Sequence, residues 1–249
     1  MDFDYRKPMH LLALILIISS IFIIIISPIF SFFEIFPSTQ SIEYQSIVEN
    51  LNILMEIFML VFQLIFALVF FILFPIIWYI VVNSKSFKGA LSKMRITLEN
   101  IDIAFLWGIL AVIAIFIFTF ALEFLLQQSG ADISDLSNIP DLEALFSPPI
   151  LFLLVAIMPV AEEIFFRGFL LEKFESFAGK NFAIVMSAVL FGIAHMSYGK
   201  IYPVVMPIIM GLLLGYIVIR TKNLYSAIIA HVTFNVTVIV LYFAFSSFV

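Results

Sequence analysis

The sequence predicts an all-α membrane protein, a polytopic bundle of about seven transmembrane helices. Of its 249 residues, 64% are hydrophobic and only 12% are charged. A soluble domain is about half apolar and about a quarter charged, so this chain has more apolar side chains than a water-facing fold can cover. Mean hydropathy is +1.21. Seven apolar runs are close to or above the roughly 20 residues that a helix needs to cross a bilayer.

The apolar runs give the expected spans in chain order. They are residues 11–33, 53–82, 103–126, 149–171, 181–199, 201–219 and 224–245. The first follows Arg6 and Lys7 as a signal sequence would, but it is 23 residues long and lacks a following small-x-small cleavage site, so we expect a retained span. The second, at 30 residues, is longer than a bilayer requires. We expect it to tilt, to bend near Pro75, or to begin as an interfacial turn around Glu56.

The distribution of cations predicts a cytoplasmic N-terminus and an external C-terminus, because Lys and Arg collect in cytoplasmic loops. The loops on the N-terminal side hold Arg6, Lys7, Lys85, Lys88, Lys93, Arg95, Lys173, Lys180, Arg220 and Lys222. The opposite loops hold only one cation, Lys200, together with the acids Glu34, Glu43, Glu49, Asp132, Asp135, Asp141 and Glu143. An eighth helix or a re-entrant segment around residues 197–200 would move the C-terminus to the other side.

Charge and cysteine content exclude several function classes. The net charge is −5 and the pI about 5.1, and the cations are scattered over short loops, so the chain has no basic surface for nucleic acid. It contains no cysteine, which removes disulfides, thiolate metal ligands and cysteine nucleophiles. Any chemistry must use carboxylates, imidazoles, amides or hydroxyls.

Polar side chains inside three of the apolar spans are the candidates for function, since a charge at the centre of a bilayer costs about 2.5–3.5 kcal/mol on insertion scales. They are Glu162, Glu163 and Arg167 on one span, His195 on the next, and His231 with Asn235 on the last. Residues four apart share a helix face, so Glu163 can pair with Arg167 while Glu162 projects toward a different neighbour. The same spacing places His231 and Asn235 on one face, and Phe191 beneath His195.

Each of these features also has a purely structural explanation. Glu163 and Arg167 can be a packing ion pair, Asn235 can hydrogen-bond between helices, and a single histidine can be a satisfied interior residue. Together with an unpaired Glu162 they favour a polar site between helices, and we expect its cavity to open toward the cytoplasmic leaflet. Elsewhere, Gly211 and Gly215 form a small-xxx-small motif that indicates close helix packing, and Glu56 and Glu123 are expected at the membrane interface.

Three motifs in order, Glu-Glu-x-x-x-Arg at 162–167, Phe-x-x-x-His at 191–195 and His-x-x-x-Asn at 231–235, resemble the CAAX protease and bacteriocin-processing family, also called CPBP or Abi. The resemblance covers about residues 149–240. It implies an intramembrane endopeptidase that acts on a peptide or a lipidated protein. Some family members remove the last three residues of prenylated proteins and others have peptide-related substrates, and the motifs do not choose between these.

The resemblance also implies roles for individual residues. The implied catalytic set is Glu162, which activates a water, His195 beside it, and His231 with Asn235, which stabilise the oxyanion; the supporting residues are Glu163, Arg167 and Phe191. No cofactor is implied. Because Glu162, His195 and His231 are also the ligand types of a His₂-carboxylate zinc site, a zinc mechanism is the alternative.

The resulting expectation is an integral protein of a prokaryotic cytoplasmic membrane. Residues 1–100 form an N-terminal transmembrane region of two helices and a basic loop, and residues 101–249 form the catalytic core. Two other functions stay open at this point: a non-catalytic scaffold or bacteriocin self-immunity protein of the same fold, and an ion-coupled transporter, which the lack of repeat symmetry between the halves disfavours.

Overall fold

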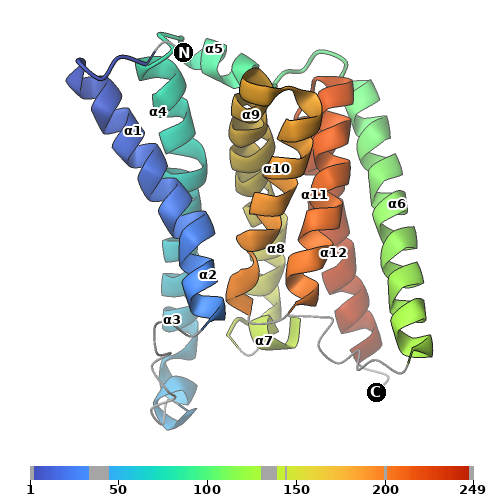
Figure 1. Ribbon diagram of the computed structural model, residues 1–249. Helices are drawn as coiled ribbons and strands as arrows, with labels where there is room; N and C mark the ends of the chain where they lie inside the picture. The colour runs from blue at the N-terminus through green and yellow to red at the C-terminus, as the bar shows by residue number, and fades with distance from the viewer. Residues whose placement is uncertain (1–2, 34–44, 130–138, 144, 199–200, 247–249) are drawn as a thin grey trace.

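The computed structural model describes residues 3–33, 45–129, 139–143, 145–198 and 201–246, and every regular element in these ranges is a helix. Within these ranges, six helices are long and apolar enough to cross a membrane, and a seventh apolar helix is shorter. The chain runs up and down through the bundle, so α1 begins and α12 ends at opposite ends (Figure 1). This confirms the predicted all-α membrane bundle.

Each of the first two spans is one continuous helix with an internal π-helical stretch. The segments are α1 (Pro8–Ile21), η1 (Phe22–Ile26) and α2 (Ser27–Phe32), then α3 (Gln45–Phe66), η2 (Ala67–Leu73) and α4 (Phe74–Val81). A short α5 (Phe87–Lys93) leads into α6 (Ile101–Gln128). The π-helical stretch η2 ends just before Pro75, which lies in the first turn of α4.

The remaining helices carry all three motifs. They are α7 (Ile139–Glu143), α8 (Pro148–Glu163), η4 (Ile164–Leu170), α9 (Leu171–Ala178), α10 (Lys180–Ile193), η5 (Met196–Tyr198), α11 (Tyr202–Thr221) and α12 (Tyr225–Ser246). The segments α8, η4 and α9 form one helix, in which η4 is π-helical, whereas η5 is a single 3₁₀ turn.

The predicted fifth span, 181–199, is wrong at its end. The α-helix stops at Ile193, and its 14 residues reach only about 21 Å, less than the roughly 30 Å of hydrocarbon. The backbone turns there, with His195 N donating to Gly192 O at 2.9 Å, so His195 lies after the helix and not within it. Between α10 and α11 the described residues contain only η5; Gly199 and Lys200 lie outside them.

Most of the acids assigned to the external loops fall outside the described side chains, namely Glu34, Glu43, Glu49, Asp132, Asp135 and Asp141. Glu56 is described, and it does more than face the interface. Its Oε2 accepts hydrogen bonds from Ser147 N at 3.0 Å and from Ser147 Oγ at 2.6 Å. Ser147 is the N-cap residue of α8, so Glu56 ties α3 to the start of the helix that carries the first motif.

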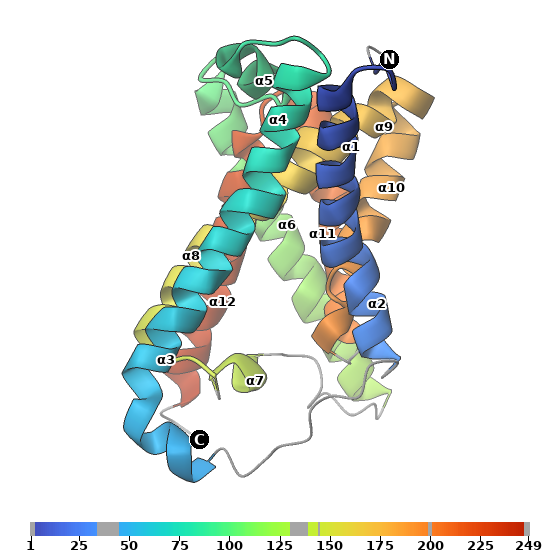
Figure 2. The same ribbon diagram turned by 90° about the vertical axis from the view of Figure 1, so that its left-hand side faces the viewer.

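Polar contacts hold the elements together at the end of the bundle near α5. Asn223, in the turn between α11 and α12, donates from Nδ2 to Thr97 O at 3.0 Å and to Glu99 O at 2.8 Å. Arg95 forms an ion pair with Glu175 of α9. The opposite end is looser: in Figure 2 the span α1–α2 and the helix α3 spread apart toward the end where α7 lies.

Helices α10 and α11 pack closely because glycine removes side chains between them. A Cβ on Gly211 would lie 2.9 Å from the Ala188 Cα, which is closer than real Cβ atoms approach a backbone atom. Gly215, one turn later in the same motif, differs: its Cβ would meet Ile184 at 3.5 Å, an ordinary contact. Of the two glycines in the small-xxx-small motif, only Gly211 is required for the close packing of α10 against α11.

We therefore expect Gly211→Ala to destabilise the protein and Gly215→Ala to leave stability unchanged or slightly raised. Forcing a methyl group into a packed contact costs about 1–3 kcal/mol, whereas a helical Gly→Ala substitution without a clash gains about 0.5–1 kcal/mol. Thermal unfolding of both variants in detergent tests this pair. Equal midpoints for the two variants would contradict the close contact at Gly211.

Candidate functional site

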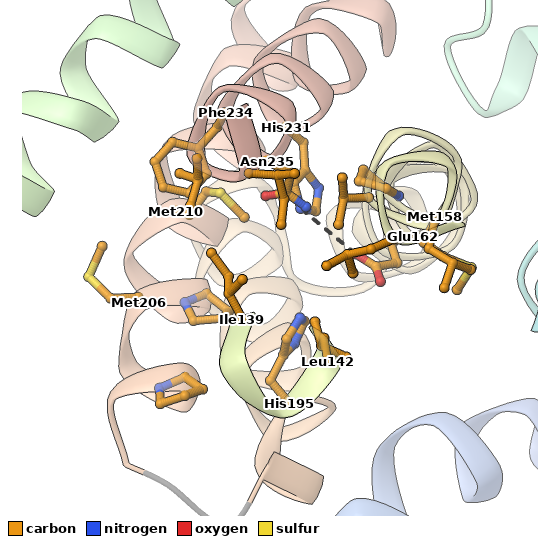
Figure 3. Close-up of a pocket in the computed structure, with 18 of the residues that line it drawn as sticks. Ile139, Leu142, Met158, Glu162, His195, Met206, Met210, His231, Phe234 and Asn235 are labelled. Atoms are coloured by element: carbon orange, nitrogen blue, oxygen red, sulfur yellow. Dashed lines mark ion pairs between the residues drawn. The ribbon is translucent and has the colours of Figure 1, made fainter. Parts of the chain in front are cut away.

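A cavity of about 460 Å³ lies between α6, α8, α11 and α12, and α7 borders it at the outer end (Figure 3). Its walls come from the halves of these helices that lie nearer to α7, such as Leu151–Glu162 on α8 and His231–Ile239 on α12. Most of the lining is apolar, including Met206, Met210 and Phe234. The candidate residues Glu162, His195, His231 and Asn235 all line this cavity.

The position of the cavity does not fit the expectations of a cytoplasmic N-terminus and a cytoplasmic cavity taken together. The cation-rich loops lie at the end of the bundle near α5, and the cavity occupies the half toward α7. With the N-terminus placed in the cytoplasm, the cavity lies on the external side and not in the cytoplasmic half.

Glu162 lies at the inner part of the cavity, near the end of α8. Its side chain is 18% exposed, and its Oε2 is 3.8 Å from His231 Nε2, the pair marked in Figure 3. Pro159, three residues earlier, lines the same cavity and interrupts the backbone hydrogen bonds of α8 because it has no N–H. The first motif thus places a partly solvated carboxylate beside an imidazole from a helix far away in sequence.

His231 is positioned by a fully buried ion pair. Glu163 Oε1 accepts from Arg167 Nη1 at 2.8 Å, as the i,i+4 spacing predicts, and both side chains are 0% exposed. The same oxygen lies 2.8 Å from His231 Nδ1. A carboxylate paired with a guanidinium is ionised and can only accept, so Nδ1–H is the donor and Nε2 points toward Glu162. Adjacent residues of α8 therefore contact the two nitrogens of one ring, which sequence spacing does not reveal.

The ion pair has spare hydrogen-bonding capacity. Glu163 Oε2 and the Arg167 Nε and Nη2 atoms are buried without a hydrogen-bond partner among the described residues. Part of the arginine charge is instead met by an aromatic face, because Arg167 Cζ lies 4.1 Å from the centre of the Phe191 ring.

The Phe191 ring also contacts the two histidines of the site, His195 and His231. Its ring meets His195 edge-on at 4.7 Å and His231 at 5.6 Å between centroids, and it is fully buried. His195 Nδ1 lies 2.8 Å from Phe191 O, and since a carbonyl only accepts, the ring proton is on Nδ1. Phe191 therefore orients one imidazole through its backbone and both through its ring.

Asn235 lies one helical turn beyond His231 and lines the cavity beside it (Figure 3). Its amide makes no hydrogen bond with any residue in the described part of the chain. The amide and the His231 imidazole thus face the same space, as expected from their spacing.

A second cavity of about 230 Å³ lies between the first two spans and η4, and Glu162 and His195 line it as well. Gln63 of α3 and Met158 of α8 also belong to both cavities. The carboxylate and the imidazole therefore lie where the two cavities meet. The contribution of Gln63 was missed from sequence, because one glutamine in an apolar run gives no periodic signal.

Glu162, His195 and His231 are the residues that a zinc mechanism would use. Within the described ranges, no group of three or more His, Asp and Glu side chains is arranged to hold a metal ion. The Nδ1 atom of His231 faces the Glu163 carboxylate, and that of His195 faces a backbone carbonyl. These Nδ1 contacts orient the two rings.

The buried pair makes a specific prediction about folding. Glu163→Gln leaves the Arg167 charge uncompensated in the core, and breaking a buried pair in this way costs about 3–5 kcal/mol. The double variant Glu163→Gln with Arg167→Met removes both charges and should recover most of the loss. Thermal unfolding in detergent measures both. A single variant as stable as the wild type, or a double variant no better than the single, would contradict this account.

The comparisons with known proteins agree with the site. Residues 144–237 match a family model described as type II CAAX prenyl endopeptidase Rce1-like. No curated protein and no solved structure gives a significant match. The matched segment contains all three motifs, with Glu162, His195, His231 and Asn235, and this confirms the resemblance seen in the sequence. Over residues 144–237 this integral membrane chain matches the Rce1-like family of CAAX endopeptidases.

Proposed function

We propose that this protein is an intramembrane endopeptidase in which Glu162 activates the hydrolytic water. One observation carries the proposal: Glu162 Oε2 lies 3.8 Å from His231 Nε2 at the inner end of a cavity of about 460 Å³. The match of this segment to an endopeptidase family supports it.

The proposed reaction uses only side chains that line the cavity. Glu162, with His195 next to it, takes a proton from a water, and the water oxygen attacks the carbonyl carbon of the peptide bond. His231 Nε2–H and the Asn235 amide donate to the oxygen that becomes negative. Glu162 then passes its proton to the leaving nitrogen as the C–N bond breaks. Each lost oxyanion donor costs on the order of 10²–10³ in rate.

Glu163 acts in this scheme through His231. Its carboxylate accepts from Nδ1–H and so aims Nε2 toward the cavity, where the ring donates when both of its nitrogens carry a proton. Arg167 holds the Glu163 carboxylate in place by pairing with it. These two residues, with Phe191, are positioning residues, because none of them lines the cavity.

We further propose that the substrate reaches the site from the external side of the membrane. The supporting facts are the ten cations at the α5 end and the position of the cavity toward α7. A substrate delivered there is an exported or lipid-embedded peptide. A prenylated cytoplasmic C-terminus would have to approach from the opposite end of the bundle.

We expect Glu162→Gln to abolish cleavage, since the amide is similar in size but cannot accept the proton. The assay uses purified protein in liposomes and mass spectrometry of unmodified and farnesylated peptides, with and without a zinc chelator. Glu99→Gln, an exposed acid far from the cavity, is the matched control and should keep full activity. Cleavage by the Glu162→Gln variant would end the proposal, and loss of activity with chelator would replace it by a metal mechanism. Absence of any cleavage by wild type would favour a scaffold function.

The sidedness can be tested because the natural chain has no cysteine. Lys88→Cys in α5 and Ser129→Cys after α6 are exposed positions at opposite ends of the bundle. With intact cells, an impermeant maleimide should label the cysteine at 129 and should reach the one at 88 only after permeabilisation. The reverse pattern would place the cavity on the cytoplasmic side.

A further inference from the structure

The outer part of the cavity contains a carboxylate that the proposed reaction does not use. Glu123 lies near the end of α6 and lines the cavity, with its side chain partly exposed. It forms no hydrogen bond or ion pair with another residue of the described ranges. A charge within an apolar span is costly, so an unpaired one that faces a cavity calls for a ligand.

A second polar group lies next to this carboxylate. Thr119 is four residues earlier on α6, on the same helix face, and also lines the cavity. Its Oγ1 is buried and has no hydrogen-bond partner in the part of the chain that the structure describes, although a buried hydroxyl is ordinarily bonded. Tyr202 at the start of α11 also lines the cavity.

The charge of the cavity favours a cation at this place. Among the described residues its lining contains two glutamates, Glu123 and Glu162, and neither lysine nor arginine; its two histidines, His195 and His231, lie at the inner end beside Glu162. A neutral group at Glu123 would leave the carboxylate without compensation in an apolar wall, whereas an ammonium or guanidinium would pair with it and could donate to the Thr119 hydroxyl as well. Met206 and Met210 offer an apolar surface for the methylene stem of such a side chain.

The distance to the reacting atoms suits a peptide side chain. Glu123 lies five residues before the end of α6, and Glu162 lies fourteen residues after the start of α8; both of these helix ends face α7. At 1.5 Å per residue the two carboxylates differ in depth by on the order of 10 Å, the length of about three or four residues of extended chain.

We propose that Glu123 and Thr119 form a specificity site for a lysine or arginine side chain of the substrate, about three or four residues from the bond that is cleaved. The inference rests on the proposed function and names the class of its substrate, a cationic peptide. Glu123 does not take part in the chemistry, so its loss alters which peptides are cleaved and leaves the cleavage step intact.

The test compares peptides that are identical except for one residue, lysine or its neutral analogue norleucine, scanned over the positions on each side of the cleaved bond. At one of these positions we expect wild type to show a kcat/KM about tenfold higher for lysine, or more. Glu123→Gln should bring this ratio close to one with norleucine peptides cleaved as before, and Glu123→Lys should prefer a glutamate peptide. Asp102→Asn, which removes an exposed acid from the other end of α6, should keep the wild-type ratio.

Binding separates this inference from the proposed function. The peptides are titrated against Glu162→Ala and against Glu162→Ala with Glu123→Gln, both purified in detergent. Tighter binding of the lysine peptide to the first protein only would support the specificity site even if wild type cleaves nothing. Equal affinity for lysine and norleucine peptides in both proteins, or an unchanged kcat/KM ratio in Glu123→Gln, would overturn it.

Discussion

The buried pairing of Glu163 with Arg167 is the interaction on which the rest of the site depends. Both side chains are completely buried in a bundle of apolar helices, so neither charge is tolerable without the other. The carboxylate oxygen that pairs with Arg167 also accepts a hydrogen bond from His231 Nδ1–H, and the guanidinium lies against the Phe191 ring. A single ionic contact therefore sets the position of a histidine on α12 and of an aromatic ring on α10.

The same arginine links helix packing to the site. An added Cβ at Gly211 would lie 2.9 Å from Arg167 Nη2 as well as from the backbone of α10. The glycine thus makes room for the guanidinium and for the neighbouring helix together. A change at Gly211 or Arg167 therefore alters both the stability of the bundle and the geometry of the site, since the groups that pack the helices together also orient the imidazoles.

The fold class could be predicted from the sequence, and so could the polar residues that line the cavity together. Helical spacing predicted the Glu163–Arg167 pair because both partners lie on one helix, where separation in sequence fixes separation in space. The bridge from His231 to both glutamates could not be predicted, because it joins residues 68 positions apart through the relative rotation of two helices. The end of α10 was also misjudged, since the apolar Ala194 and Met196 still follow Ile193 and hydropathy does not register a turn. Glu56 and Glu123 show the same limit: each was expected at the interface, yet Glu56 holds Ser147 across helices and Glu123 faces an internal cavity.

The π-helical stretch η4 begins directly after Glu163 and has a consequence for the length of this helix. An i→i+5 stretch holds an extra residue compared with an α-helix, and each residue turns the following chain by about 100°. Beyond η4 the same helix contacts Tyr79 through Glu172 and Arg95 through Glu175. Deleting one residue here would rotate those contacts away from their partners whenever Glu162 and Glu163 keep theirs. The rotation of this helix is thus fixed by contacts on both sides of η4. The number of residues between these contacts therefore matters as much as which residues make them.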